Sequence, residues 1–334
     1  MLALLSGIAA AQTPPPIVGG SEATGWPYRQ VGALVATKGS AGAAFCSGSL
    51  VDNQRVVTAA HCVLQGIDAY EGAGYTIHFV VADDVSGTWD ASSTIKKTVV
   101  HPDYSSTSTP TDDIAVLYLD TAITGFGTLP VSTNAPKSSQ VGEDITYVGY
   151  GLTDSDLSGS SGVRRKVKIP LYHFDGDFLY TYAGGASQNV CSGDSGGAAM
   201  WKRDDGTWEL VGVNSFVFDL DGTYPPDCDS GKPAAGAVRI ETTLSFLREH
   251  IDIPDEESDS DADSDADTDT DSDTDSDSDT DTATETGLLD TASPDDTGSD
   301  SEPGGCLGCA SSSSPAGAGF GVFLLLGLLW RRRR

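Results

Sequence analysis

Short β-branched segments, separated by glycine, serine, aspartate and asparagine, make up the chain from Ile17 to about Asp252. Such segments are typical of strands joined by turns. Only Thr242–Ile251 has apolar residues at helical spacing, which predicts one late helix. Many short strands and a single helix predict an all-β fold of the sandwich or barrel kind. The expected strands are Gly32–Thr37, Arg55–Thr58, Tyr75–Val81, Ile95–Val100, Ile114–Leu119, Ile145–Val148, Lys166–Leu171 and Trp208–Val213.

The region that follows is too acidic to form a core. Residues 255–302 contain 21 acidic residues and no lysine or arginine, and aspartate alternates with serine, threonine or alanine over most of 255–281. Because like charges repel and nothing apolar is available for burial, we expect a disordered Asp/Ser/Thr-rich spacer over residues 253–305. Calcium binding is the alternative, since aspartates are calcium ligands, but within the spacer no glycine precedes Gly287 to turn a calcium loop.

The net charge of −30 belongs mainly to this spacer, and the remainder of the chain is only mildly acidic. A strongly acidic chain repels nucleic acid, and the sequence has no basic patch to bind it. We therefore expect no nucleic-acid partner.

The N-terminal residues indicate export. Met1–Ala11 is apolar and ends in small residues, as a signal peptide does, but the usual basic residues are missing from its start. Either the start is misplaced or the N-terminus lies upstream, and residues 12–16 then form a short propeptide. The alternative is a buried apolar segment, which the three prolines after Thr13 oppose because they break regular structure.

The cysteines agree with export. An even number of cysteines in an exported domain indicates disulfide bonds. The residues alone leave three pairings open for the four cysteines of the β-rich region, which are Cys46, Cys62, Cys191 and Cys228.

Residues 306–334 contain Cys306 and Cys309, an apolar segment from Ala316 to Trp330, and four arginines. At about 1.5 Å per residue the apolar segment reaches about 22 Å, which is short for a hydrocarbon core of about 30 Å. The arginines predict a cytoplasmic end. The three features resemble the MYXO-CTERM type of sorting signal. This resemblance implies a short hydrophobic helix, membrane contact through this segment only, a sortase-like processing enzyme as partner, and a protein secreted or anchored at the bacterial surface.

Three short segments contain the residue types of nucleophilic catalysis. Thr58–Cys62 includes His61, Asp112–Leu117 places acids directly before a strand, and Gly193–Gly197 places Ser195 among glycines. Each alone has a structural explanation: a core histidine, a turn and a tight loop. Together they supply a serine nucleophile, an imidazole base and a carboxylate that orients the base. The glycines leave backbone amides free to bind a developing oxyanion.

In these residues the chain resembles the trypsin/chymotrypsin family of serine peptidases, from about Ile17 to Ile251. Ile17-Val18-Gly19-Gly20, His101-Pro102 with Tyr104, and Gly149-Tyr150-Gly151 also resemble family motifs. The resemblance implies a peptidase domain over residues 17–252, built from two antiparallel six-stranded β-barrels with a C-terminal helix. It implies protein or peptide substrates, no cofactor and no metal.

The resemblance also assigns roles to individual residues. The family's acid directly precedes an Ile-Ala pair, which selects Asp113 over Asp112. The implied roles are His61 as general base, Asp113 as orienting acid, Ser195 as nucleophile, the amides of Gly193 and Ser195 as oxyanion hole, Ile17 and Asp194 as an activation ion pair, and Cys46–Cys62 and Cys191–Cys228 as disulfides.

The substrate-binding residues implied by the resemblance are Asn189, Ser215 and Val217. An aspartate in place of Asn189 would favour arginine or lysine at P1, the substrate residue before the scissile bond, whereas asparagine has no charge to neutralise them. Val217 replaces a glycine and should narrow the pocket. One of Ala234 or Ala235 replaces another pocket glycine. We expect an uncharged P1 residue of small to medium size.

One departure from the family concerns activation. Zymogens of the family are usually cut after arginine or lysine, whereas Pro16 precedes Ile17 here, which argues against tryptic activation. The leading hypothesis is a secreted or surface-attached serine endopeptidase. The alternative is a catalytically silent, protease-like binding or adhesion module, which the Pro16–Ile17 junction favours and the intact triad opposes.

Overall fold

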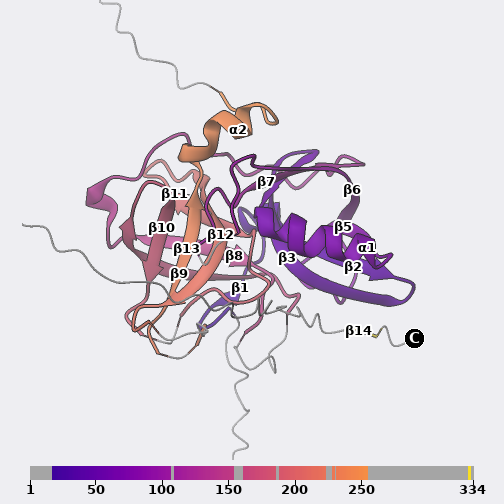
Figure 1. The fold of residues 1–334 in the computed structure, drawn as a ribbon, viewed down its shortest axis with the longest axis horizontal. Helices are drawn as coiled ribbons and strands as arrows, with labels where there is room; N and C mark the ends of the chain where they lie inside the picture. The colour runs from indigo at the N-terminus through magenta and orange to yellow at the C-terminus, as the bar shows by residue number, and fades with distance from the viewer. Residues whose placement is uncertain are drawn as a thin grey trace, which may run out of the picture. The chain divides into compact units, whose positions relative to one another are not determined.

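The computed structural model in Figure 1 describes residues 17–106, 109–153, 161–185, 188–222, 228–229, 231–254 and 330–331. Two antiparallel sheets of this region each close into a six-stranded barrel, as the resemblance implied. A short helix follows the last strand of the second barrel. The barrels are the chymotrypsin fold.

The first barrel is closed by pairing between β3 and β4, which gives the strand order β3-β2-β5-β6-β7-β4. The two-residue strand β14 (Trp330–Arg331) adds to the edge of β3 at Gly42 and Ala41. The barrel strands are β2 (Val31–Lys38), β3 (Ala41–Asp52), β4 (Arg55–Thr58), β5 (Thr76–Val81), β6 (Ala91–Val100) and β7 (Ala115–Leu119).

The second barrel is closed by pairing between β8 and β9, with the order β9-β10-β13-β12-β11-β8. The short strand β1 (Ser21–Glu22) extends this sheet beside β9. The barrel strands are β8 (Asp144–Gly149), β9 (Arg165–Phe174), β10 (Phe178–Tyr182), β11 (Ala198–Lys202), β12 (Trp208–Asp219) and β13 (Pro233–Arg239).

All eight expected strands are present. Four barrel strands, β3, β10, β11 and β13, and the two-residue strands β1 and β14 were not predicted. Of these, β3 is rich in alanine, glycine and serine, and β13 is rich in alanine with one glycine, all residues that carry little strand signal. Their small residues let the backbone approach the core closely: a Cβ at Gly48 would lie 2.6 Å from a Val56 methyl group. Barrel closure, rather than local propensity, thus decides these strands.

The late helix was expected over Thr242–Ile251 and consists of a 3-10 turn, η4 (Glu241–Thr243), and α2 (Leu244–Arg248). The expectation of a single helix was wrong, because a π-helical turn, η2 (Cys62–Ile67), and α1 (Asp68–Gly72) directly follow His61. Apolar residues of this segment pack into the first barrel. Two further 3-10 turns are η1 (Tyr28–Gln30) and η3 (Ser138–Gln140).

The expected signal peptide, propeptide, Cys306–Cys309 motif and nearly all of the spacer and hydrophobic segment lie outside the described residues. The possible calcium ligands of the spacer lie there too. Within the described ranges, no helix has the length and apolar character needed to cross a membrane.

Candidate active site

Two neighbouring strands of the first barrel bring His61 and Asp113 together. β4 ends just before His61, β7 begins just after Asp113, and the two strands pair antiparallel with Thr58 opposite Ala115. The imidazole Nδ1 of His61 lies 2.7 Å from Oδ2 of Asp113, and the backbone amide of His61 donates to Oδ1 at 2.9 Å. Two bonds to one carboxylate fix both the position of the residue and the plane of its ring.

Asp113 is fully buried and holds a third hydrogen bond, from the hydroxyl of Ser215 at 2.5 Å. Burial by itself would raise the pKa of Asp113, but the imidazole of His61 and the bonds from His61 and Ser215 bring that pKa below its ordinary value. The register of β12 shifts between Asn214 and Phe216, which marks a bulge at Ser215. Sequence analysis placed Ser215 in the substrate pocket and missed its bond to Asp113.

The neighbouring aspartate, Asp112, has a different environment. It is more than one-third exposed, and its carboxylate lies 3.9 Å from Nδ1 of His101. The charge of Asp113, in contrast, acts on Tyr104: burial first, and then this charge, raises the pKa of Tyr104 to about 12. The structure thus brings Asp113, rather than Asp112, to His61.

The nucleophile loop, residues 193–197, packs against the first barrel. The backbone amide of Ser47 donates to the carbonyl of Ser195 at 2.8 Å. Gly196 has a positive φ of 77°, and a Cβ there would collide with the side chain of Thr58 and the carbonyl of Ser47. Only glycine allows this close approach. It places Ser195 next to the segment from Thr58 to His61.

Asp194 is the second fully buried carboxylate of the site. It accepts hydrogen bonds from the backbone amides of Gly151 at 2.8 Å and Cys191 at 2.9 Å. Burial nevertheless raises the pKa of Asp194 to about 7, and these two bonds and the charge of Arg165 offset only part of the effect. A Cβ at Gly149 or Gly151 would collide with Asp194. This explains the two glycines that flank Tyr150.

Ile17 is fully buried in the core of the second barrel, and the next residue, Val18, accepts a 3.0 Å backbone bond from Asn189. Ile17 is joined to Pro16 in this chain, so its nitrogen is a neutral amide. Among the described residues Asp194 forms no ion pair with a cationic side chain. The activation ion pair therefore stays a prediction.

The expected specificity residues lie close to the second disulfide. Asn189 is almost fully buried, and neither polar atom of its carboxamide has a hydrogen-bond partner within the described part of the chain. Val217 is half-buried and packs against Val18, Leu152 and the Cys191–Cys228 bridge. Ala235 lies opposite Val217 on β13, and Ala234 lies opposite Phe218.

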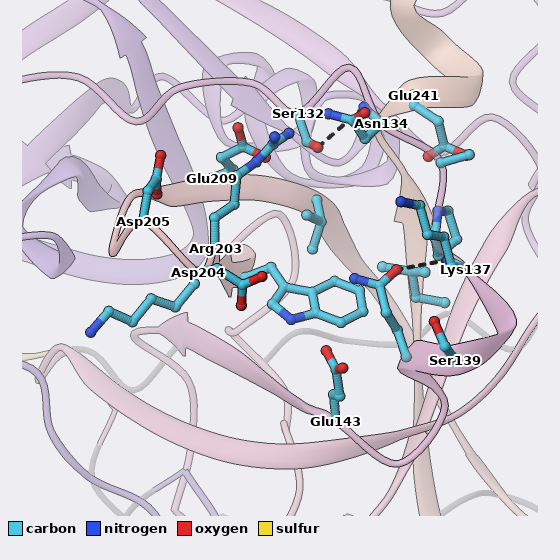
Figure 2. Close-up of a pocket in the computed structure, with 17 residues that line it drawn as sticks. Ser132, Asn134, Lys137, Ser139, Glu143, Arg203, Asp204, Asp205, Glu209 and Glu241 are labelled. Carbon is cyan, nitrogen blue, oxygen red and sulfur yellow. Dashed lines mark hydrogen bonds and ion pairs between the residues drawn. The ribbon is translucent and has the colours of Figure 1, made fainter.

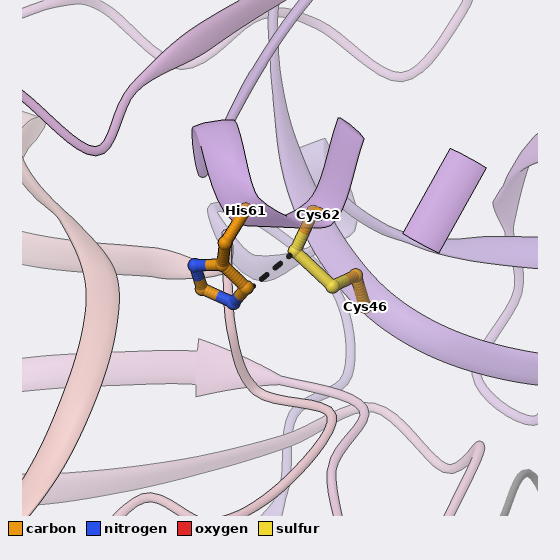
Figure 3. Close-up of side chains that lie close together, drawn as sticks. All are labelled: Cys46, His61 and Cys62. Atoms are coloured by element: carbon orange, nitrogen blue, oxygen red, sulfur yellow. Dashed lines mark hydrogen bonds between the residues drawn. A yellow bond between two sulfur atoms is a disulfide. The ribbon is translucent and has the colours of Figure 1, made fainter. Parts of the chain in front are cut away.

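Both implied disulfides are confirmed, with Cα–Cα distances of 6.2 Å for Cys46–Cys62 and 5.4 Å for Cys191–Cys228. Figure 3 shows His61 beside the first of these bridges. Cys46, His61 and Cys62 lie close enough together to suggest a metal site. Metal binding by cysteine needs thiolates, however, and both sulfurs are used in the disulfide.

A cavity of about 560 Å³ lies elsewhere on the second barrel (Figure 2). It is lined by parts of β11 and β12 and by the segment around η3, and it contains the ion pair between Arg203 and Glu209 at 2.7 Å. The expected site residues are not among those that line it.

The fold and site are of the chymotrypsin-like class. The first barrel supplies the Asp113–His61 pair, the second supplies the hydroxyl that bonds Asp113, and both lie beside the Gly-Asp-Ser-Gly-Gly loop. Residues 17–230 match the family model described as Trypsin. The chain therefore belongs to the trypsin family, with a serine peptidase domain over this range.

Curated relatives support this membership. The chain is 29% identical to CLIP domain-containing serine protease B4 of Anopheles gambiae, over 62% of the chain and 60% of that protein. It is 28% identical to phenoloxidase-activating enzyme 1 of Spodoptera litura, over 52% of each. It is 31% identical to brachyurin of Leptuca pugilator, over 63% of the chain and 88% of that protein. The match thus spans about half to three-fifths of the length of the first two relatives.

Proposed function

We propose that the protein is a serine endopeptidase that hydrolyses peptide bonds through an acyl-enzyme on Ser195. The observation that carries this proposal is the pairing of a partly exposed His61 with the buried Asp113, held by two hydrogen bonds beside the loop of Ser195. A serine hydroxyl needs such an oriented base to act as a nucleophile near neutral pH.

In the proposed reaction, Ser195 Oγ attacks the scissile carbonyl while Nε2 of His61 takes the hydroxyl proton. Nδ1–H of the resulting imidazolium donates to Asp113, whose negative charge stabilises it. The amides of Gly193 and Ser195 donate to the oxyanion. His61 returns the proton to the leaving amine, and a water molecule, activated by the same base, then hydrolyses the acyl-enzyme and restores Ser195.

Activation is proposed to occur by cleavage between Pro16 and Ile17. The new α-ammonium of Ile17 would supply the cation that Asp194 lacks in the uncleaved chain. The raised pKa of Asp194 supports this step, because burial outweighs the two backbone amides and the charge of Arg165 that favour the ionised carboxylate. The processing peptidase must accept proline before the cleavage site, so it differs from trypsin in specificity.

For substrate choice we propose an uncharged P1 residue of small to medium size. The buried carboxamide of Asn189 has no charge to pair with arginine or lysine. Its polar atoms have no hydrogen-bond partner among the described residues and could bond a hydroxyl or amide of the substrate. Val217 narrows the pocket. A peptide panel that varies only at P1 measures kcat/KM for each residue. A strong preference for arginine or lysine would contradict the proposal.

Export and surface attachment are proposed from the apolar N-terminal residues, the two disulfides, and the cysteine, apolar and arginine segments at the C-terminus. The acidic segment would then hold the peptidase domain away from the membrane until the C-terminal signal is processed. Sequencing both ends of the mature protein tests these steps and the cleavage before Ile17 together.

A fluorophosphonate probe tests the enzyme proposal directly, because it reacts with an activated serine. We expect stoichiometric labelling at Ser195 once Ile17 is the N-terminus. Ser195→Ala should abolish labelling, whereas Ser192→Ala, at an exposed neighbouring serine, should leave it intact. Absence of label in correctly processed protein would instead favour the silent binding module.

A further inference from the structure

Ser47, in the middle of β3, is fully buried and has every polar group in a hydrogen bond. Its backbone amide donates to the carbonyl of Ser195 at 2.8 Å, and its own carbonyl accepts from the hydroxyl of Thr58 at 2.8 Å. Its hydroxyl lies 2.9 Å from the carbonyl of Gly193 and 3.0 Å from the amide of Tyr150. One side chain thus joins the first barrel to two loops of the second.

The direction of the hydroxyl proton of Ser47 is fixed by these two neighbours. The amide of Tyr150 can only donate, so Ser47 Oγ accepts there. The carbonyl of Gly193 can only accept, so the hydroxyl proton points to it. The arrangement has one consistent assignment, and neither buried backbone group is left without a partner.

The bond from Ser47 completes the fixation of the backbone around Gly193. The carbonyl of Ser192 accepts from the amide of Leu152 at 2.8 Å, and the amide of Asp194 donates to the carbonyl of Cys191 at 3.0 Å. In a planar trans peptide the N–H points away from the preceding C=O, so the bond to Ser192 sets the direction of the Gly193 N–H. The peptide after Gly193 is held by the carbonyl of Cys191 on its N–H side and by the hydroxyl of Ser47 on its C=O side.

We propose that the hydroxyl of Ser47 is a positioning group for the oxyanion hole. It holds the Gly193–Asp194 peptide and thereby keeps the Gly193 amide aimed at the reacting carbonyl. This inference rests on the proposed peptidase function. Ser47 itself touches neither substrate nor the reacting atoms.

A purely structural role and a positioning role for Ser47 predict different effects on kcat, KM and the unfolding temperature. A structural hydrogen bond supports the fold, and its loss lowers the unfolding temperature without changing turnover in the molecules that remain folded. A misaimed oxyanion donor weakens the transition state more than the bound substrate, and therefore lowers kcat with little change in KM.

The test compares Ser47→Ala with a matched control on the same strand. Ser49 is also buried, two residues further along β3, but its hydroxyl has no hydrogen-bond partner among the described residues. In Ser47→Ala we expect kcat to fall about 10-fold to 100-fold, somewhat less than the loss of an oxyanion donor itself, with KM within about twofold. Affinity for a peptide aldehyde, which mimics the tetrahedral intermediate, should fall in parallel. Ser49→Ala should change neither.

Thermal unfolding of each variant shows whether it is folded at the assay temperature. If Ser47→Ala does not fold, Ser47→Thr and Ser47→Val form a second pair of equal shape that differs in the hydroxyl. Threonine should then turn over at least 10-fold faster than valine. Equal turnover within the folded pair, or an unchanged kcat in Ser47→Ala, overturns the inference.

The same experiments separate this inference from the proposed function. Wild-type protein that begins at Ile17 and does not react with a fluorophosphonate would refute the peptidase proposal itself. Active wild-type protein with an unaffected Ser47→Ala variant would refute only the role of Ser47.

Discussion

Asp113 and Asp194 are both fully buried carboxylates, one just before β7 of the first barrel and the other in the nucleophile loop of the second barrel. Burial raises the pKa of each, but the net shifts have opposite signs. The pKa of Asp113 lies below its ordinary value, and that of Asp194 lies at about 7. The difference comes from their partners: Asp113 has an imidazole and a hydroxyl in addition to a backbone amide, whereas Asp194 has two backbone amides.

This comparison separates two kinds of buried acid. Asp113 is already compensated in the uncleaved chain, so it can remain ionised and stabilise an imidazolium as soon as one forms. In the uncleaved chain the negative charge of Asp194 is only partly compensated, and a nearby cation would be needed to compensate it fully. Of the two buried acids, only Asp194 is therefore suited to report activation.

The largest expected effect is the loss of Asp113. Asp113→Asn keeps the shape but removes the charge and favours the wrong tautomer of His61, so we expect kcat to fall about 10⁴-fold, the size known for this exchange in the triad class. Steady-state hydrolysis of a peptide substrate measures the change. Asp112→Asn is the matched control at the adjacent, more exposed position and should retain activity within about threefold. A larger loss at Asp112 would reverse the assignment of the acid.

The next effect concerns stability and pH in the chain that retains Pro16. When a carboxyl has a higher pKa in the folded than in the unfolded state, it adds to the free energy of unfolding at low pH. That contribution is complete below the unfolded-state pKa and is lost as pH rises through the folded-state pKa. For Asp194, whose pKa is raised from 3.8 to about 7, the free energy of unfolding should fall by about 4 kcal/mol as pH rises between these values. Urea unfolding of Ser195→Ala protein at pH 4, 5.5 and 7.5 measures it without self-digestion.

Asp194→Asn in the same background provides the control for that titration. Its unfolding free energy should lack the decline over this range, while the opposite contribution of Asp113 remains: present above the unfolded pKa and lost as pH falls. Cleavage before Ile17 should likewise remove the decline, because an ammonium partner lowers the pKa of Asp194. Equal pH profiles for uncleaved Ser195→Ala protein with and without Asp194→Asn would show that Asp194 is not an uncompensated acid.

A smaller effect is expected at Ser215. Ser215→Ala removes the bond from a hydroxyl to a charged carboxylate, an interaction of about 2 kcal/mol, so kcat should fall about 10-fold or somewhat more. The pKa of Asp113 should rise because one stabilising bond is lost. Steady-state kinetics and the acid limb of the pH–rate profile measure the two changes. An unchanged kcat with altered P1 preference would indicate that Ser215 acts in the pocket instead.

The smallest expected effect is at Arg165, whose charge lowers the pKa of Asp194 from a distance. Arg165→Gln should shift the titration of Asp194 in the uncleaved chain upward, without loss of activity in the cleaved enzyme. NMR titration of the Asp194 carboxyl carbon measures the shift. Lys166→Gln, one residue further along β9, is the control. A downward shift would mean that Arg165 acts by another route than its charge.

Sequence patterns located most of the fold. The eight expected strands exist because β-branched residues favour extended backbone and pack well on a pleated surface. β3 and β13 carried too little of that signal, since β3 is mainly alanine, glycine and serine, and β13 is mainly alanine and glycine. The helical segment after His61 was missed because its apolar residues occupy only two short turns, and the first of these is π-helical rather than α-helical.

The reactive residues were found because each lies in a short local motif, and the close approaches at Gly196, Gly149 and Gly151 show why those motifs contain glycine. The roles of Ser47 and Ser215 left no such pattern. Each is one serine among many, and its partner lies 146 or 102 residues away. Neither could be identified before the strands were paired.

From the residues alone, an all-β domain, an acidic segment and the residue types of a nucleophilic site could be predicted, because these depend on composition and on neighbours along the chain. The family resemblance implied which aspartate contacts His61 and which cysteines pair, and the packing of the barrels brings these residues together. Which buried acid is compensated could not be read from the sequence. Those outcomes depend on distances across two closed barrels and on the water they exclude. Hydrogen-bond geometry and desolvation, which set the pKa of Asp113 and Asp194 in opposite directions, exist only once the barrels have formed.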